Sequence, residues 1–216
     1  MSDPLRWWPG KYADCKRIAQ LVAEFLPAGE VLEHGGPGIF ADLLPQYRVT
    51  TARVADGVDL CNLPYEDDHF DVGVSARVLE LLPPPLRPAY LRELLRTSRY
   101  RAFVALPLQP ELEAIDKLKN GYIWDTTRVW QHPGPRPDDL ERLLEGQDVE
   151  LSFHVESPSA LEFAPRDSPR VLMDALLAAP LRGTDLAPAT PNFVVAEIAK
   201  ANVLPPMLLA TSHASH

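Results

Sequence analysis

The residues with the clearest chemical potential form a glycine-rich turn, Glu33-His34-Gly35-Gly36-Pro37-Gly38. The turn follows a short apolar segment, 30–33, and precedes a segment, 38–46, that can form a short helix. Glycines let a ligand approach the backbone closely, and the start of a helix offers backbone N–H groups to it. A plain strand-to-helix turn has the same pattern, so the assignment depends on the segments around it.

A second polar segment, 59–69, precedes a run typical of a buried strand, 70–75. Its first residue is Asp59, whose carboxylate can accept a hydrogen bond from an exocyclic amine of a ligand. Aspartate is also common in turns, so a purely structural role for Asp59 stays open. Asp71, at the start of the strand, is expected to be structural.

The elements that must position these segments alternate along the chain. Apolar periodicity and capping residues predict helices over 11–26, 85–98, 110–122 and 138–145 and near 168–179. Apolar or β-branched runs predict strands over 30–33, 48–53, 70–75, 101–106, 149–155 and 192–199. Such alternation favours a mostly parallel sheet covered on both faces, which binds ligands beyond the carboxyl ends of its strands. The ligand crevice is therefore expected at the glycine-rich turn.

The composition argues against several classes of protein. The chain of 216 residues carries a formal charge of −9, which is unsuited to binding nucleic acid or an anionic membrane. It has no apolar run of the ~18 residues that a membrane span requires. Cys15 and Cys61 lie in no metal-binding pattern, so no metal site is expected and both are expected to be reduced thiols. The N-terminus lacks the apolar stretch of a signal peptide, and a cytoplasmic location is expected.

Three motifs, in this order and at this spacing, resemble class I S-adenosylmethionine (SAM)-dependent methyltransferases. They are the segment 31–38, the segment 59–72 and Val78-Leu79-Glu80-Leu81-Leu82-Pro83. They correspond to the family patterns VLDxGxGxG, DxxxLPFxDxxFDxV and VLEHLP. The resemblance covers about residues 12–108, with weaker support from the strand FVVAEIAK near the C-terminus.

The resemblance implies an α/β fold of the Rossmann-like methyltransferase type. Its doubly wound, mostly parallel sheet would have seven strands, with helices on both faces. We expect one domain over 1–203, with substrate-side insertions at 109–137 and 157–190 and a flexible tail at 204–216.

The resemblance also implies site residues. Glu33 would lie near the methionine moiety and ribose of SAM, and Asp59 beside the adenine amino group, with Asn62 and Leu63 lining the adenine pocket. Ser75, Ala76 and Arg77 follow a strand where cofactor and substrate would meet. The full expected cofactor-binding set is Glu33, His34, Gly35, Gly36, Gly38, Arg53, Asp59, Leu60, Asn62, Leu63, Ser75 and Ala76.

The catalytic residues are less defined. Methyl transfer is an in-line displacement that needs positioning and, for some acceptors, a general base. His132 and His154 lie where this family diversifies for substrate and are weak candidates, because a lone histidine is more often an ordinary surface or core residue. The aromatic segment 122–132 can line a substrate pocket or pack on the sheet. The segment 7–12 can form a lid, anchor the first helix or contact a second subunit.

The chain departs from the family pattern in three places. Pro37 and Ile39 stand at the later glycine positions, or the loop is one residue short. Arg53 follows the second strand, where an acid would grip the ribose hydroxyls, and Leu81 replaces the histidine of the third motif.

Three hypotheses follow. The first is SAM-dependent methyl transfer to a small-molecule acceptor, without a nucleic-acid or membrane partner and with a homodimer left open. The second is a methyltransferase-like binding or assembly protein without catalysis, whose crevice would be filled by side chains such as His34, Ile39 or Arg53. The third is a nucleotide-dependent oxidoreductase in which Arg53 would meet the 2′-phosphate of NADPH. It is disfavoured because GxGxxG is absent and no acid ends the second strand.

Overall fold

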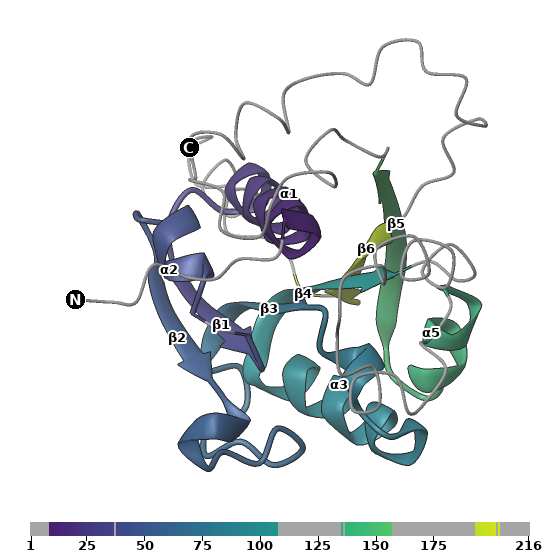
Figure 1. Ribbon diagram of the computed structural model, residues 1–216. Helices are drawn as coiled ribbons and strands as arrows, with labels where there is room; N and C mark the ends of the chain where they lie inside the picture. Colours follow the sequence, from purple (N-terminus) through teal and green to yellow (C-terminus); the bar gives the residue numbers. More distant parts are fainter. Residues whose placement is uncertain are drawn as a thin grey trace, which may run out of the picture.

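The computed structural model describes residues 9–36, 38–107, 135, 137–156, 193–201 and 203. Its helices are α1 (Pro9–Phe25), α2 (Phe40–Leu43), α3 (Arg87–Thr97) and α5 (Pro137–Leu143) (Figure 1). Its strands are β1 (Glu30–His34), β2 (Arg48–Ala52), β3 (Phe70–Ala76), β4 (Ser98–Pro107), β5 (Val149–Glu156) and β6 (Phe193–Lys200). The expected helices over 110–122 and near 168–179, the insertion 157–190, the tail 204–216 and most of 109–137 lie outside the described residues.

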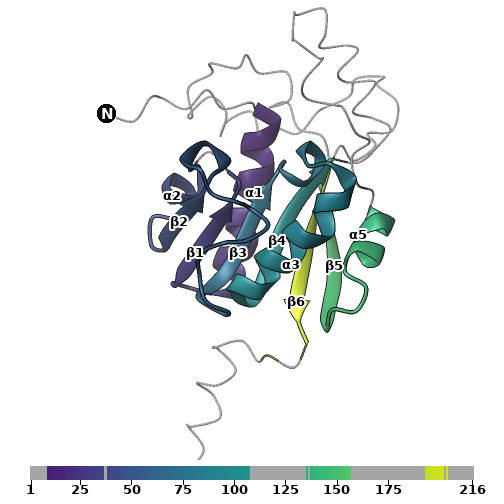
Figure 2. The same ribbon diagram turned by 90° about the horizontal axis from the view of Figure 1, so that it is seen from below.

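The strands form one sheet in the order β2-β1-β3-β4-β6-β5, which Figure 2 shows side by side. β1 pairs in parallel with β2 and β3, and β3 pairs in parallel with β4. β6 runs antiparallel to both β4 and β5, so β5 points the same way as the first four strands. The chain winds outward from β1 to β2 and then returns to β3 on the other side of β1. The carboxyl ends of β1 and β3 therefore flank the topological switch point, where such sheets bind ligands.

The expected count of seven strands is wrong for the part of the chain that the structure describes, which contains six. β2 leads through a 3₁₀ turn at Val54–Asp56 and an irregular loop directly into β3. This loop contains Gly57, Asp59, Asn62 and Pro64 and lacks a β-branched run. Such residues favour turns over strands, so no further strand forms between β2 and β3.

Side chains alternate between two cores because successive residues of a strand face opposite sides. One core joins α1 and α2 to the sheet through Val31, Val72, Val74, Phe103 and Val195. The other joins α3 and α5 to the sheet through Leu32, Phe70, Ala102, Val104 and Ile198. Figure 1 shows α1 and α2 on one side of the sheet and α3 on the other. The expected arrangement, with helices on both faces, is confirmed.

Local sequence explains the element boundaries. α1 ends at Phe25, just before Pro27. α2 is shorter than the expected 38–46, because Leu44 already leaves the helical conformation ahead of Pro45. Asp71 accepts the backbone N–H of Glu30 at 2.9 Å and pairs with Arg99, which confirms its structural role. None of the described helices has the length and apolar character to cross a bilayer.

Candidate functional site

The glycine-rich turn is shaped by Glu33, which is fully buried at the carboxyl end of β1. Its carboxylate accepts the backbone N–H groups of Gly38 at 3.0 Å, Ile39 at 3.3 Å and Phe40 at 3.3 Å. The hydroxyl of Thr51 on β2 donates to the same carboxylate at 3.4 Å. Glu33 therefore holds the turn, the start of α2 and β2 together, so these three N–H groups are already committed within the protein.

Three glycines of the turn meet different steric requirements. Gly35 and Gly38 have φ of +81° and +90°, a left-handed conformation that glycine adopts without cost. A Cβ on Gly36 would lie 1.9 Å from Oε1 of Glu33, so no other residue fits over the carboxylate. A Cβ on Gly38 would come within 4 Å only of the Thr51 hydroxyl at 3.9 Å, among the described residues. Pro37 itself lies outside the described residues.

His34 faces the opposite side of the sheet from Glu33 and is also fully buried. Its Nε2 lies 2.8 Å from the carbonyl oxygen of Leu60. A carbonyl oxygen only accepts, so Nε2 carries the proton and Nδ1 is the unprotonated nitrogen. Nδ1 is buried and has no hydrogen-bond partner among the described residues. Burial lowers the pKa of His34 to about 4, which keeps the imidazole neutral at neutral pH.

Tyr90 of α3 connects the carboxyl ends of β1 and β3. Its ring stacks on that of His34, with centroids 4.2 Å apart and planes 7° from parallel. Its hydroxyl donates to the backbone carbonyl of His34 at 2.9 Å and lies 2.6 Å from Oγ of Ser75. The one phenolic proton is committed to that carbonyl, so Ser75 donates to Tyr90. Burial raises the pKa of Tyr90 above its usual range.

The sequence analysis predicted a helix over 85–98 from its apolar spacing and did not identify Tyr90 as a site residue. A usable signal was present, because a tyrosine on a buried helix face usually needs a partner for its hydroxyl. Which partner it finds depends on how α3 packs on the sheet.

The loop that begins at Asp59 lies against the glycine-rich turn. Asp59 is exposed, and its Oδ1 accepts the backbone N–H of Cys61 at 2.9 Å, which forms an Asx turn. Leu60 is buried, and a Cβ on Gly35 would lie 3.1 Å from its Cδ1 and 2.8 Å from Val78. The structure therefore brings Leu60, the residue after Asp59, to the first glycine of the turn.

The same loop is fastened to α3 at Leu63. The backbone N–H of Leu63 donates to Glu93 at 2.6 Å, and its carbonyl accepts Nη2 of Arg96 at 3.3 Å. Arg96 also binds Glu93 and Asp67. The bond from Arg96 is the main cause of the lowered pKa of Glu93. Sequence reasoning missed Glu93 and Arg96, whose spacing of three on a helix was the available signal. Asn62, between the two anchored leucines, is exposed.

The carboxyl end of β3 carries Ser75 and Ala76, both buried, followed by Arg77. Arg77 has φ of +58°, a conformation uncommon outside glycine. Its guanidinium forms an ion pair with Asp14 of α1, and the Asp14 side chain is fully buried. This pair connects the first half of α1 to the carboxyl end of β3, which is the end of the sheet at which the glycine-rich turn lies.

The residue after β2 is Arg53, where the family pattern has an acid, and it forms an ion pair with Asp56. Arg53 binds Asp56 through Nε at 2.7 Å and Nη2 at 3.3 Å, and both side chains are about half exposed. Arg53 therefore points into solvent and does not fill the crevice. Ile39 is buried in the core beside α1, and His34 lies against Tyr90.

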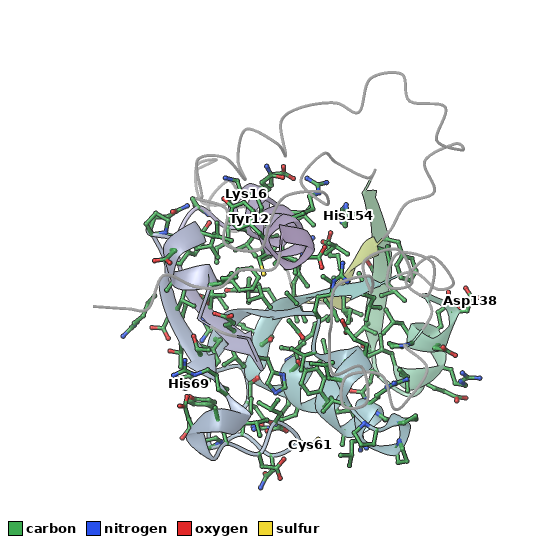
Figure 3. The ribbon with its side chains drawn as sticks, in the orientation of Figure 1. Tyr12, Lys16, Cys61, His69, Asp138 and His154 are labelled. Atoms are coloured by element: carbon green, nitrogen blue, oxygen red, sulfur yellow. The ribbon has the colours of Figure 1, made fainter. Side chains whose placement is uncertain are left out.

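His154 lies apart from the glycine-rich turn. It pairs with Val195, which pairs with Ala105, which pairs with Ala76, so it is level with the carboxyl end of β3. Three strand spacings separate β5 from β3, about 14 Å at ~4.8 Å each. Its Nε2 lies 2.8 Å from Glu197, which also binds Arg101. Figure 3 shows His154 on the α1 side of the sheet, where Tyr12 and Lys16 also lie. His132 and the segment 122–132 lie outside the described residues, as do Trp7 and Trp8.

No family model and no curated protein matches the sequence. Solved structures do match. A SAM-dependent methyltransferase from Archaeoglobus fulgidus has a TM-score of 0.52 and 19% identity, covering 88% of this chain and 94% of that chain. The 1,6-didemethyltoxoflavin N1-methyltransferase of Burkholderia thailandensis, with bound S-adenosylhomocysteine, has a TM-score of 0.52 and 16% identity, covering 87% and 78%. A possible histamine N-methyltransferase from Thermotoga maritima has a TM-score of 0.52 and 16% identity, covering 90% and 93%. The expected class I methyltransferase fold is thus confirmed.

Proposed function

We propose that this chain is a SAM-dependent methyltransferase that acts on a small-molecule acceptor. The observation that carries the proposal is the meeting of three features at the switch point of this fold. They are the glycine-rich turn after β1, the loop that carries the exposed Asp59 and packs its Leu60 on Gly35, and the buried end of β3 at Ser75 and Ala76. SAM, when bound, supplies an electrophilic methyl group that an acceptor can displace in line.

The Asp59 loop fits the adenine end of such a cofactor. A carboxylate has about four acceptor positions, and the N–H of Cys61 uses one of them. The exposed remainder can accept the exocyclic amine of adenine. The buried backbone contacts of Leu60 and Leu63 fix the loop that carries this carboxylate before a ligand arrives.

The glycine-rich turn fits close approach of a ligand to the backbone. Gly35 and Gly38, both with positive φ, present no side chain at their positions in the turn. The N–H groups of Gly38, Ile39 and Phe40 are bound to Glu33. The turn would therefore admit a ligand because of its backbone conformation, without donating these N–H groups to it. Glu33 maintains that conformation.

The ribose position is the part of the site that does not fit. Two hydroxyls need an acceptor at the end of β2, and the structure has Arg53 there, bound at two points to Asp56. This observation favours the second candidate function, a methyltransferase-like binding or assembly protein without catalysis. It also predicts that SAM binds more weakly than it would to a chain with an acid at this position.

The proposal of a small-molecule acceptor rests on the composition of the chain. The chain is net acidic, which suits a small uncharged or cationic acceptor better than a nucleic acid. For acceptors that must lose a proton, His132 and His154 remain the candidate bases. His154 is the one whose partner is described, since Glu197 binds its Nε2.

Titration calorimetry of the full chain separates the candidates. SAM and S-adenosylhomocysteine should both bind, and the Asp59→Asn variant should bind them about tenfold more weakly, a change of 1.4 kcal/mol. Asp138→Asn, the same change at an exposed aspartate in the first turn of α5, is the matched control. Heat from NADPH alone would indicate the oxidoreductase. No heat from SAM, S-adenosylhomocysteine or NADPH at millimolar concentration would leave the non-catalytic protein as the answer.

A further inference from the structure

A buried chain of hydrogen bonds underlies the candidate site and involves residues that do not themselves contact solvent. Ser75 donates to Tyr90 at 2.6 Å, and Tyr90 donates to the carbonyl of His34 at 2.9 Å. His34 in turn donates through its imidazole to the carbonyl of Leu60 at 2.8 Å. These hydrogen bonds join β3, α3, β1 and the Asp59 loop in one network.

The imidazole carries a cost that an apolar side chain would avoid. Nδ1 of His34 is buried without a hydrogen-bond partner among the described residues. A buried polar atom of this kind destabilises the folded state, whereas a leucine would pack between the same neighbours without it. What the imidazole supplies in exchange is the Nε2–H donor to Leu60, which leucine lacks.

We infer that His34 and Tyr90 are positioning residues that hold the Asp59 loop at a set distance from the glycine-rich turn, and so determine affinity for the adenosine half of the ligand. The ligand named here rests on the proposed function. The positioning of the Asp59 loop by His34 and Tyr90 does not depend on the proposed function, because it concerns only contacts within the protein.

The geometry explains how two residues can do this. The imidazole is rigid, and it is held at both ends. At one end, the backbone carbonyl of His34 accepts the hydroxyl of Tyr90. At the other end, Nε2 of the ring donates to the carbonyl of Leu60. Its face lies on the Tyr90 ring, which prevents rotation. Gly35 directly follows His34 in the sequence, and Asp59 directly precedes Leu60. The side chain of His34 therefore sets the spacing between the glycine-rich turn and the loop that carries the Asp59 carboxylate.

The test compares variants at one position. His34→Leu keeps apolar bulk and removes the donor, and His34→Gln restores an N–H that can reach the Leu60 carbonyl. Tyr90→Phe keeps the stacked ring and removes the hydroxyl. Leu32→Ala is the control, because Leu32 lies two residues earlier on β1 in the same core and outside the network. Hydrogen exchange of the amides of 60–63 is measured in each, with the affinity for adenosine and for S-adenosylhomocysteine.

His34→Leu should speed exchange of the 60–63 amides by about tenfold and weaken both ligands by a similar factor. His34→Gln should stay within about threefold of the native chain, and Tyr90→Phe should fall between them. Leu32→Ala should lower the melting temperature while leaving exchange and affinity near native. Native exchange at 60–63 in folded His34→Leu, or an equal effect in Leu32→Ala, would overturn the inference. If the native chain binds neither ligand, the proposed function fails, and the exchange data still decide the role of His34.

Discussion

The imidazole of His34 lies flat on the phenol ring of Tyr90, with centroids 4.2 Å apart and planes 7° from parallel. The stack joins the end of β1 to α3, and both residues are fully buried. Hydrogen bonds lead from it to Leu60 on one side and to Ser75 on the other. The glycine-rich turn and the Asp59 loop consequently share one buried support, and a change in either ring should affect both segments.

Acid should weaken the fold through His34. The pKa of this imidazole is lowered by burial from 6.5 to about 4, so the unfolded chain takes up a proton in this interval and the folded chain does not. The free energy of unfolding should fall as pH drops through this window, by up to about 3 kcal/mol, and should be insensitive to His34 above it. Urea denaturation at several pH values measures the slope. The His34→Leu variant should have a shallower slope between these pH values, and an unchanged slope would refute the assignment.

Glu33 should be a major stabilising residue although it lies in the site. Replacing it with glutamine removes the charge that three backbone N–H groups bind. Hydrogen bonds to charged groups contribute about 1.5–3 kcal/mol each, so Glu33→Gln should lower the free energy of unfolding by about 2–3 kcal/mol. The comparison is Glu30→Gln on the same strand, where the acid is paired with an exposed Arg48. That surface change should cost less than about 1 kcal/mol. Equal losses in the two variants would show that the buried carboxylate has no special role.

Removal of one partner of the Asp14–Arg77 ion pair should strongly destabilise the fold. Asp14 is fully buried and Arg77 has a side chain only 12% exposed, so Asp14→Asn leaves a poorly solvated cation. Loss of one member of a buried pair costs about 3–5 kcal/mol, whereas replacing both with apolar residues is often nearly neutral. Chemical denaturation should therefore rank Asp14→Asn well below the double variant Asp14→Leu with Arg77→Met. The reverse ranking would mean that the pair is not what holds α1 to the end of β3.

An acid in place of Arg53 should strengthen binding of the nucleoside. The Arg53→Asp variant supplies an acceptor for the ribose hydroxyls and releases Asp56. We expect S-adenosylhomocysteine to bind about tenfold more tightly than to Arg53→Ala, as measured by calorimetry. Stability should be unchanged within about 1 kcal/mol, because both side chains of the present pair are nearly half exposed. Unaltered or weaker binding by Arg53→Asp would place the ribose elsewhere.

Much of the fold is readable from the chain because its signals are local. Apolar spacing over 11–26 predicted α1, and Pro27 marked its end. β-branched and apolar runs located all six strands of the described sheet to within a few residues. The glycine-rich turn followed from its place after the first strand. In each case the deciding contacts lie within a few residues of one another, so the sequence pattern already contains them.

The tertiary structure decided what joins these elements. His34 meets Leu60 across 26 residues and Tyr90 across 56, Leu63 meets Glu93 across 30, and Asp14 meets Arg77 across 63. It also decided that β2 passes to β3 without a seventh strand between them, where the resemblance implied seven. Such contacts depend on which layers pack together and at what register, and periodicity along the chain carries no information about either. The sequence thus determined where the turn and the carboxylate stand, and only the packing of α3 and α1 on the sheet determined what supports them.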